Sequence, residues 1–257
     1  TLGTTFLLLN SKSRRFPNGL GNNYDNVGRY LMDHVKIGSV LADYEGFEDK
    51  YYYGRRPGGC YIPRFRNIGN DKADFLRGWG MQGSATRGWQ QAAGIGAEFK
   101  TAISEPGGWT LSMNAYGECL PYKENKVSLH EERKDKWGLP ILKIDCSFKE
   151  NEHKMFKDMV ETGKEMMGKT GGKNPRYVGE MSTPGNANHE MGTARMGLDP
   201  KTSVLNKWNQ IHDAKNVFIT DGSCMTSSSC VNPSLTYMAL TARAADFAVA
   251  ELKKGNL

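Results

Sequence analysis

The apolar positions of the first forty residues predict a helix, a loop and a strand. Leu2, Phe6 and the run Leu7–Leu9 give residues 1–12 an apolar helical face that ends at Asn10 and Ser11. Residues 13–25 are rich in Asn, Gly and Pro, which is typical of a loop. Ordered structure resumes over 27–34, and residues 35–42, VKIGSVLA, have the pattern of a β-strand.

The middle of the chain has the pattern of an antiparallel sheet. Short apolar and aromatic runs separated by glycine occur at residues 51–53, 58–63, 75–81 and 108–117. Residues 125–148 contain two further strand patterns, KVSLH and PILKIDCSF, joined by a charged turn. This section therefore predicts strands rather than a helical bundle.

Two longer stretches have helical periodicity. Methionines 155, 159 and 166–167, with Phe156 and Val160, follow helical spacing over 151–167, which indicates the core-facing side of a helix rather than a cofactor site. The sequence Ser-Thr-Pro-Gly at 182–185 marks the start of a different segment, in which a strand at 216–220 precedes a serine-rich loop. An alanine-rich helix is predicted from about Pro233 to Lys254, with apolar positions that include Leu235, Met238 and Leu252.

Composition and charge narrow the class of protein. The chain has 257 residues and a net charge of +6, with acidic and basic residues interspersed, which is typical of a solvated surface and argues against nucleic-acid binding. Five cysteines without a CxxC pair predict neither a zinc site nor a disulfide framework. They therefore do not distinguish a periplasmic from a cytoplasmic protein. No apolar run is long enough for a membrane span. Because the sequence starts within a predicted helix, we expect a part of a longer protein.

A histidine and a distant amide suggest alcohol oxidation. His189 lies in the stretch NHEMGTARMG, and Asn232 precedes Pro233 at the start of the last predicted helix. A histidine can take a proton from a hydroxyl group, an amide can hold the same oxygen, and neither can accept a hydride, so an organic cofactor is required. A lone histidine is more often structural, and we interpret His34, His130, His153 and His212 in that way.

Several segments resemble one family. NHEMGTARMG, NVFITDGSCM and CVNPSLTYMALTARAADFA are similar to the C-terminal region of the glucose-methanol-choline (GMC) flavoprotein oxidoreductases, and TLGTTFLLLNS with VGRYLMDH resembles the middle of the same family. The residues LLLNS, GRYLMDH and HEMGTARMG are most similar to bacterial sugar dehydrogenases of the gluconate 2-dehydrogenase and glucoside 3-dehydrogenase kind. Between these segments the similarity is diffuse.

The resemblance implies a role for each matching residue. His189 corresponds to the catalytic base, and Asn232 to the second active-site position, which orients the oxygen while the hydride passes to N5 of FAD. Asp221 and Gly222 correspond to residues near the ribityl and pyrophosphate groups, and Asn232, Pro233 and Thr236 to the border of the flavin ring. Without the resemblance, Asp221 and Gly222 would be interpreted as a turn that ends a strand.

The chain lacks the family's nucleotide-binding turn in its proper context. Gly78-Trp79-Gly80-Met81-Gln82-Gly83 matches GxGxxG, but a charged stretch precedes it and no clear helix follows, so we interpret it as a chance match. We therefore expect FAD to be held only in the intact enzyme, with the N-terminal FAD-binding part supplied by a missing half or by a second chain.

These features together predict a mixed α/β fold in three parts. We expect a residual FAD-domain helix and loop in residues 1–25, an antiparallel-sheet substrate domain in 26–183, and a C-terminal FAD-domain segment with the active-site residues in 184–257. The predicted function is flavin-dependent oxidation of a sugar or other alcohol, with a small-molecule substrate and an electron-acceptor subunit as partners. The alternative is a non-catalytic carbohydrate-binding or scaffold remnant. A nicotinamide dehydrogenase ranks below both, since no convincing nucleotide motif is present.

Overall fold

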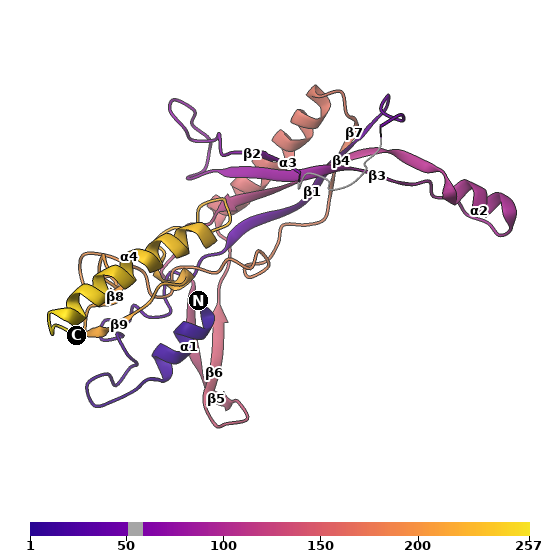
Figure 1. Cartoon of the computed structure of the whole chain (residues 1–257). Helices are drawn as coiled ribbons and strands as arrows, with labels where there is room; N and C mark the ends of the chain where they lie inside the picture. The colour runs from indigo at the N-terminus through magenta and orange to yellow at the C-terminus, as the bar shows by residue number, and fades with distance from the viewer. Residues whose placement is uncertain (51–58) are drawn as a thin grey trace. The chain divides into compact units, whose positions relative to one another are not determined.

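The computed structural model describes residues 1–50 and 59–257 and has a mixed α/β fold. Its residues form two compact units (Figure 1). Unit 1 contains Thr1–His34, Glu118–Lys149 and Thr183–Leu257, and unit 2 contains Val35–Gly117 and Glu150–Ser182. These limits differ from those of the three predicted domains, because residues 118–149 group with unit 1. The domain assignment of the intact protein stays a prediction.

Unit 2 is built on a five-stranded sheet with the order β2-β3-β4-β1-β7. The strands are β1 (His34–Tyr44), β2 (Cys60–Ile62), β3 (Trp79–Trp89), β4 (Pro106–Glu118) and β7 (Lys173–Val178). The pairs β2–β3, β3–β4 and β1–β7 are antiparallel. The expected sheet is therefore present, although the predicted tyrosine run 51–53 lies outside the described residues.

Helix α3 (Glu150–Lys169) packs against this sheet through its methionines. Met155 and Met159 are fully buried, and a Cβ atom at Gly117 of β4 would lie only 2.3 Å from the sulfur of Met155. Gly163 allows the same close approach to Val40 of β1. The predicted methionine stripe is thus confirmed as the core-facing side of a helix, since it fills the space that small sheet residues leave.

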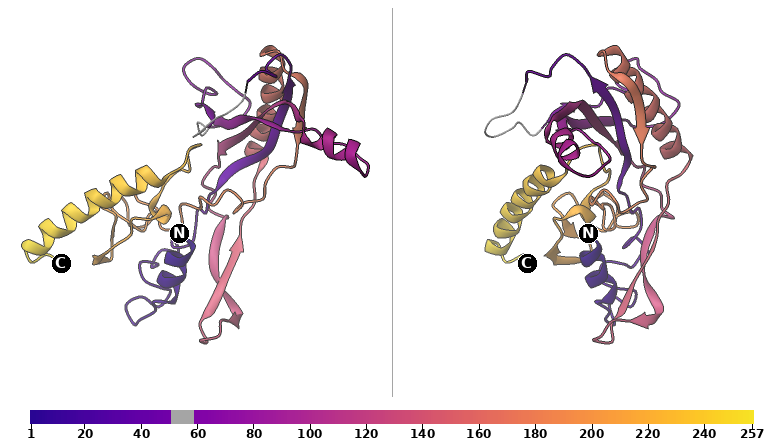
Figure 2. Two further views of the ribbon diagram at one scale, coloured as in Figure 1. Left: turned by 45° about the vertical axis from the view of Figure 1, so that its right-hand side comes forward. Right: turned by 90° about the vertical axis from the view of Figure 1, so that its right-hand side faces the viewer.

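The β3–β4 hairpin extends away from the other strands and carries helix α2 (Ala97–Ser104) at its tip (Figure 2). No residue of α2 is buried, and Trp89 at the end of β3 is 60% exposed. The literal GxGxxG match is part of this unit. Its residues enter strand β3 directly, without the strand-turn-helix geometry of a nucleotide-binding turn, which confirms the chance match.

Unit 1 surrounds a small apolar core. Helix α1 (Leu2–Asn10) packs beside the hairpin of β5 (Lys126–Lys134) and β6 (Pro140–Asp145) and beside the short 3₁₀-helix η1 (Gly222–Cys224). A second, short hairpin joins β8 (Gln210–Ile211) to β9 (Ala214–Phe218). The buried core residues are Leu8, Leu9, Val27, Ala194, Val204, Leu205, Ile211, Ile219 and Cys224.

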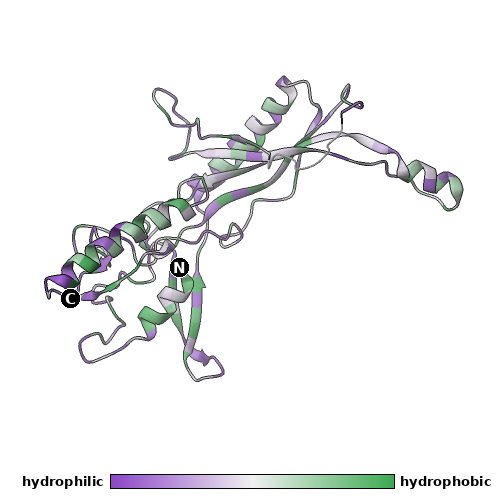
Figure 3. Cartoon of the chain, viewed as in Figure 1, coloured by the Kyte–Doolittle hydropathy of each residue, from purple (hydrophilic) through white to green (hydrophobic). Residues whose placement is uncertain are grey.

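Helix α4 (Ser234–Lys253) forms where the last helix was predicted, but its apolar side is largely exposed. Ala244 is its one buried residue, whereas Leu235 is 76% and Leu252 is 63% exposed. Figure 3 shows apolar residues along this helix. On this helix the Phe247 ring stacks on Trp208, with the centroids 4.7 Å apart. Within the described residues, no helix combines the length and apolarity that crossing a membrane requires.

Candidate functional site

The position of His189 is set by backbone pairing in unit 1. Met32 and Met191 form an antiparallel bridge with reciprocal N–H···O bonds of 3.0 and 2.9 Å, and the Gly28 N–H donates to the Thr193 carbonyl at 2.7 Å. In this register His34 lies opposite His189, so two histidines far apart in sequence become cross-strand neighbours. Asn188 immediately before His189 has a φ of +60°, a left-handed conformation that asparagine tolerates well.

The two imidazole rings are in contact. Their centroids lie 4.9 Å apart and their planes meet at 84°, so one ring presents its edge to the face of the other. Nδ1 of His189 is buried and has no hydrogen-bond partner among the described residues, whereas Nε2 is not among the buried unpaired atoms. Of the two ring nitrogens of His189, Nε2 is therefore the candidate for contact with a ligand.

His34 is almost completely buried, with 1% of its surface exposed. Its Nδ1 lies 3.0 Å from the Ser229 carbonyl oxygen, and because a carbonyl can only accept, this ring nitrogen carries the proton. Burial lowers the pKa of His34 below its ordinary value of 6.5 and His189 lowers it further, against the opposing effects of Asp33 and the Ser229 carbonyl. The ring is therefore held neutral at pH 7.

Asp33 organises the loop that carries His189. This carboxylate is 2% exposed and accepts four backbone N–H bonds. Oδ2 accepts from Gly185 at 2.8 Å and from Ala187 at 3.0 Å, and Oδ1 accepts from His34 at 2.8 Å and from His189 at 3.3 Å. Since all four donors belong to the segments on either side of the bridge, a single side chain holds the two histidine backbones together.

Asp221 and Gly222 are engaged within the chain. Asp221 accepts from the Ser223 N–H at 2.9 Å and from the hydroxyl groups of Ser223 and Thr4, and it caps η1. Burial opposes the ionisation of Asp221, but the hydrogen bonds from Ser223 and Thr4 outweigh it and lower its pKa. A Cβ atom at Gly222 would lie 2.6 Å from the Glu190 carbonyl oxygen. In this unit the pair ties η1 to the neighbouring segments.

The remaining predicted site residues lie at the start of α4. Asn232 and Thr236 are exposed, and Pro233 is buried at the N-cap of the helix, which has no side-chain cap. No hydrogen bond joins His189 to Asn232 in the part of the chain that the structure describes. Beside the histidine loop, a cavity of about 70 Å³ borders Asp33, Cys146 and Gly185. This volume suits a few water molecules rather than a sugar ring.

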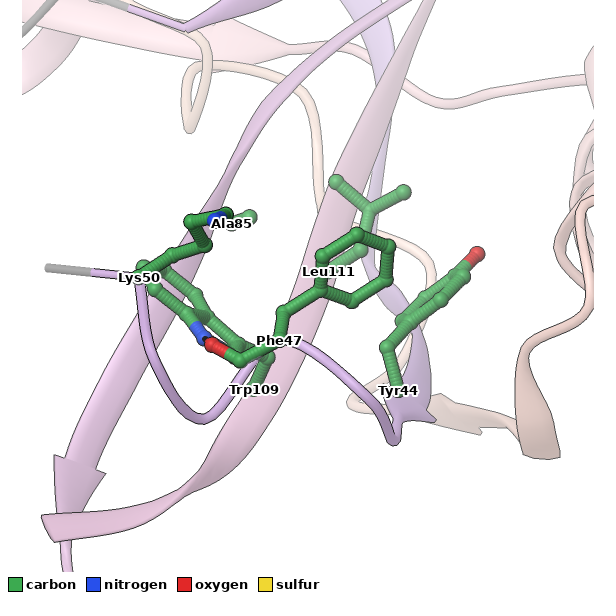
Figure 4. A pocket seen from close by; sticks show the side chains of 6 residues that line it. All are labelled: Tyr44, Phe47, Lys50, Ala85, Trp109 and Leu111. Carbon is green, nitrogen blue, oxygen red and sulfur yellow. Dashed lines mark hydrogen bonds between the residues drawn. The ribbon is translucent and has the colours of Figure 1, made fainter.

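Unit 2 contains a different kind of pocket, shown in Figure 4. It has a volume of about 290 Å³ and is lined by Tyr44, Phe47, Lys50, Ala85, Trp109 and Leu111. The Trp109 indole N–H donates to the Phe47 carbonyl at 2.7 Å, and the Tyr44 hydroxyl lies 2.6 Å from the hydroxyl of Thr170. The polar atoms of these aromatic side chains are therefore bonded within the protein, which leaves an apolar surface with one lysine.

His34, which the sequence analysis interpreted as structural, is indeed buried, but its neighbour is not an arbitrary one. The structure brings it to His189, the candidate base, and adds Asp33, which the sequence analysis did not single out. The dipeptide Asp33-His34 ends the segment VGRYLMDH, and an acid next to a histidine after an apolar run was the available signal. Its meaning depends on pairing with residues more than 150 positions away.

Comparison with known proteins identifies relatives of this chain. Residues 121–241 match the family model described as GMC oxidoreductase. The chain is 32% identical over 259 residues to the 2-methyl-1,2-propanediol dehydrogenase of Mycolicibacterium austroafricanum, covering 96% of this chain and 46% of that protein. It is 30% identical over 262 residues to the fructose dehydrogenase large subunit of Gluconobacter japonicus, covering 98% and 46% respectively.

Solved structures support the fold. The crystal structure of formate oxidase superposes with a TM-score of 0.60 and 17% identity, covering 90% of this chain and 48% of that one. The chain spans about half the length of the curated relatives that it matches. The family match, the two relatives and the mixed α/β fold lead to one conclusion: this chain belongs to the GMC oxidoreductases and carries their C-terminal part.

Proposed function

We propose that the protein carrying this chain oxidises a CH–OH group of a sugar or other alcohol, with His189 as the base. The observation that supports this most strongly is the arrangement of His189, whose ring contacts a second histidine, whose Nδ1 is buried and whose backbone is bonded to Asp33. A side chain fixed in this way is suited to accept a proton at one defined atom.

The residues present fit a flavin edge in part. Asn232 and Thr236 are exposed polar groups beside the uncapped N-terminus of α4, which suits the electron-rich oxygens and nitrogens of such a ring. Asp221 and Gly222 already have partners within the chain, so we propose that they support this border and approach the cofactor through their backbone. FAD, when bound, would accept the hydride.

In the proposed reaction, this chain manages the hydroxyl proton and oxygen. Nε2 of His189 takes the proton as the carbinol C–H bond is broken, and the Asn232 side chain donates a hydrogen bond to the same oxygen. Pro233 fixes the backbone after Asn232 at the helix start. The hydroxyl proton thus goes to His189, and the two electrons leave the carbinol carbon with the hydride.

We propose a polyol or sugar as the substrate class and further protein as a partner. Relatives are named for a propanediol, fructose and gluconate, which are all polyhydroxy compounds or small diols. Since the chain spans 46% of two of them, we propose that the nucleotide-binding part comes from the remaining polypeptide or a second chain. An electron-acceptor subunit would reoxidise the cofactor.

The test is anaerobic flavin reduction in the purified flavoprotein. A panel of sugars and diols should bleach the flavin absorbance, and His189→Ala should slow bleaching by about a hundredfold or more while the flavin stays bound. Asn232→Ala should slow it less, since one hydrogen bond is lost. The exposed His153 provides the matched control, His153→Ala, which should behave like the wild type. Unchanged reduction in His189→Ala would reject the proposal, and a protein that binds sugars without flavin would favour a non-catalytic role.

A further inference from the structure

The contacts around His189 are unequal on its two sides. The ring contacts that of His34, its Nδ1 is buried, and the backbone N–H is bonded to Asp33, whereas the described residues place no hydrogen bond on Nε2. A base that must transfer a proton needs a fixed ring plane and a lone pair at a defined atom. The groups that restrain the ring plane and the backbone of His189 belong to the segment opposite it, Asp33 and His34.

We propose that Asp33 and His34 are positioning residues for His189: Asp33 fixes the backbone of residues 185–189, and the neutral His34 ring fixes the plane of the His189 ring. This inference rests on the proposed role of His189 as the base. It assigns no substrate contact to either residue, because both are almost completely buried.

The backbone part of the proposal follows from the bonds of Asp33. Its two oxygens hold the N–H groups of Gly185, Ala187 and His189 on one side and of His34 on the other. A carboxylate that accepts several N–H bonds is a strong restraint, since each bond is charge-assisted. The loop that carries the base is therefore tied to the strand that carries His34.

The ring part follows from the protonation of His34. The Ser229 carbonyl fixes its proton on Nδ1, and Ser229 itself has a φ of +58°, a conformation that is uncommon for serine. When His189 accepts a proton, an imidazolium forms against the neighbouring ring at 4.9 Å. A neutral His34 tolerates this charge, whereas a protonated one would repel it.

Other titratable groups near Asp33 stay neutral at working pH. Burial raises the pKa of Cys146 to about 11, with a contribution from Asp33. Burial also raises the pKa of Tyr237 to about 12, with smaller contributions from several acidic groups that include Glu190 and Asp33. Neither the Cys146 thiol nor the Tyr237 phenol therefore changes its charge near neutral pH.

The experiment is the pH profile of flavin reduction in the flavoprotein, measured for the wild type and His34→Phe. If both rings must be neutral, the logarithm of the rate should fall with a slope of about two at low pH in the wild type and about one in His34→Phe. We also expect His34→Phe to be about tenfold slower at pH 7 with its flavin retained. His153→Phe, at an exposed position, is the matched control.

Two results would overturn the proposal: a wild-type rate and slope in His34→Phe, or a uniform slowing with the slope unchanged, which indicates a structural role only. If His34→Phe does not fold, nitrogen NMR of the wild-type protein at pH 7 decides, because the proposal requires a neutral His34 with its proton on Nδ1. A charged ring or the opposite tautomer contradicts it. Full activity in His189→Ala would instead reject the proposed function, so the two failures are distinguishable.

Discussion

The histidine pair of unit 1 and the aromatic pocket of unit 2 are held together by different forces. Hydrogen bonds fix the first, since Asp33 accepts four N–H groups and His34 donates to Ser229. Packing forms the second, whose lining is apolar apart from Lys50 and the bonded ends of its aromatic side chains. Directional bonds hold a reactive atom in one position, whereas apolar contacts tolerate a range of shapes.

The two regions also differ in the size of the ligand that each can hold. The cavity beside the histidine loop holds about 70 Å³, too little for a sugar ring, while the pocket of unit 2 holds about 290 Å³ but presents almost no polar group. Neither region by itself therefore provides a complete sugar site.

Removing the charge of Asp33 should have the largest effect on stability. Asp33→Asn replaces one acceptor oxygen by a donor that faces N–H groups, so we expect unit 1 to lose about 2–3 kcal/mol of unfolding free energy. Urea unfolding followed by circular dichroism provides the measurement. Asp246→Asn on the exposed surface of α4 is the control and should change stability very little. Equal effects of the two substitutions would contradict the role of Asp33 as the organising group.

Gly192 tests the backbone pairing that brings the histidines together. Its φ is +97° and a Cβ atom would lie 2.2 Å from the Tyr30 carbonyl oxygen, so Gly192→Ala should separate the paired segments. We expect a loss of about 2 kcal/mol, with slower flavin reduction. Gly108→Ala is the control, since nothing lies within 4 Å of its Cβ position. A Gly192→Ala variant with full stability would show that the pairing is not required.

Burial of His34 should make the unfolding free energy depend on pH. The folded-state pKa of His34 lies below its ordinary value of 6.5, so the unfolded chain binds the proton first as the pH falls. Stability should therefore decline below about pH 6.5, with a slope of at most about 1.4 kcal/mol per pH unit from this group. Urea melts at pH 5.5 and pH 7 should show less of this decline in His34→Phe than in the wild type. An identical decline in both would exclude His34 as a source.

A change in the aromatic pocket should have the smallest effect. Trp109→Phe keeps most of the apolar ring but removes the N–H bond to the Phe47 carbonyl, which we expect to cost about 1 kcal/mol. The pH profile of flavin reduction should keep its shape, because no group of the histidine pair has changed. A shifted profile in this variant would mean that the pocket and the histidine pair are not independent.

Local patterns predicted the elements well, because they depend on neighbours in sequence. The methionine spacing of α3, the β5–β6 hairpin and the extent of α4 all follow from periodicity and turn residues. The apolar side of α4 was predicted correctly as a pattern, yet Leu235 and Leu252 remain exposed in this chain. A pattern specifies which face is apolar, but only the neighbours present in space determine what covers it.

The sequence by itself determined the family and which residues, His189 and Asn232, are the candidates for the site, because residue types in fixed order carry that information. Only the tertiary structure decided that His34 faces His189 and that Asp33 holds both backbones. These relations depend on the register of two segments more than 150 residues apart, which no local pattern encodes. The cross-strand register therefore makes His34 a neighbour of the candidate base His189.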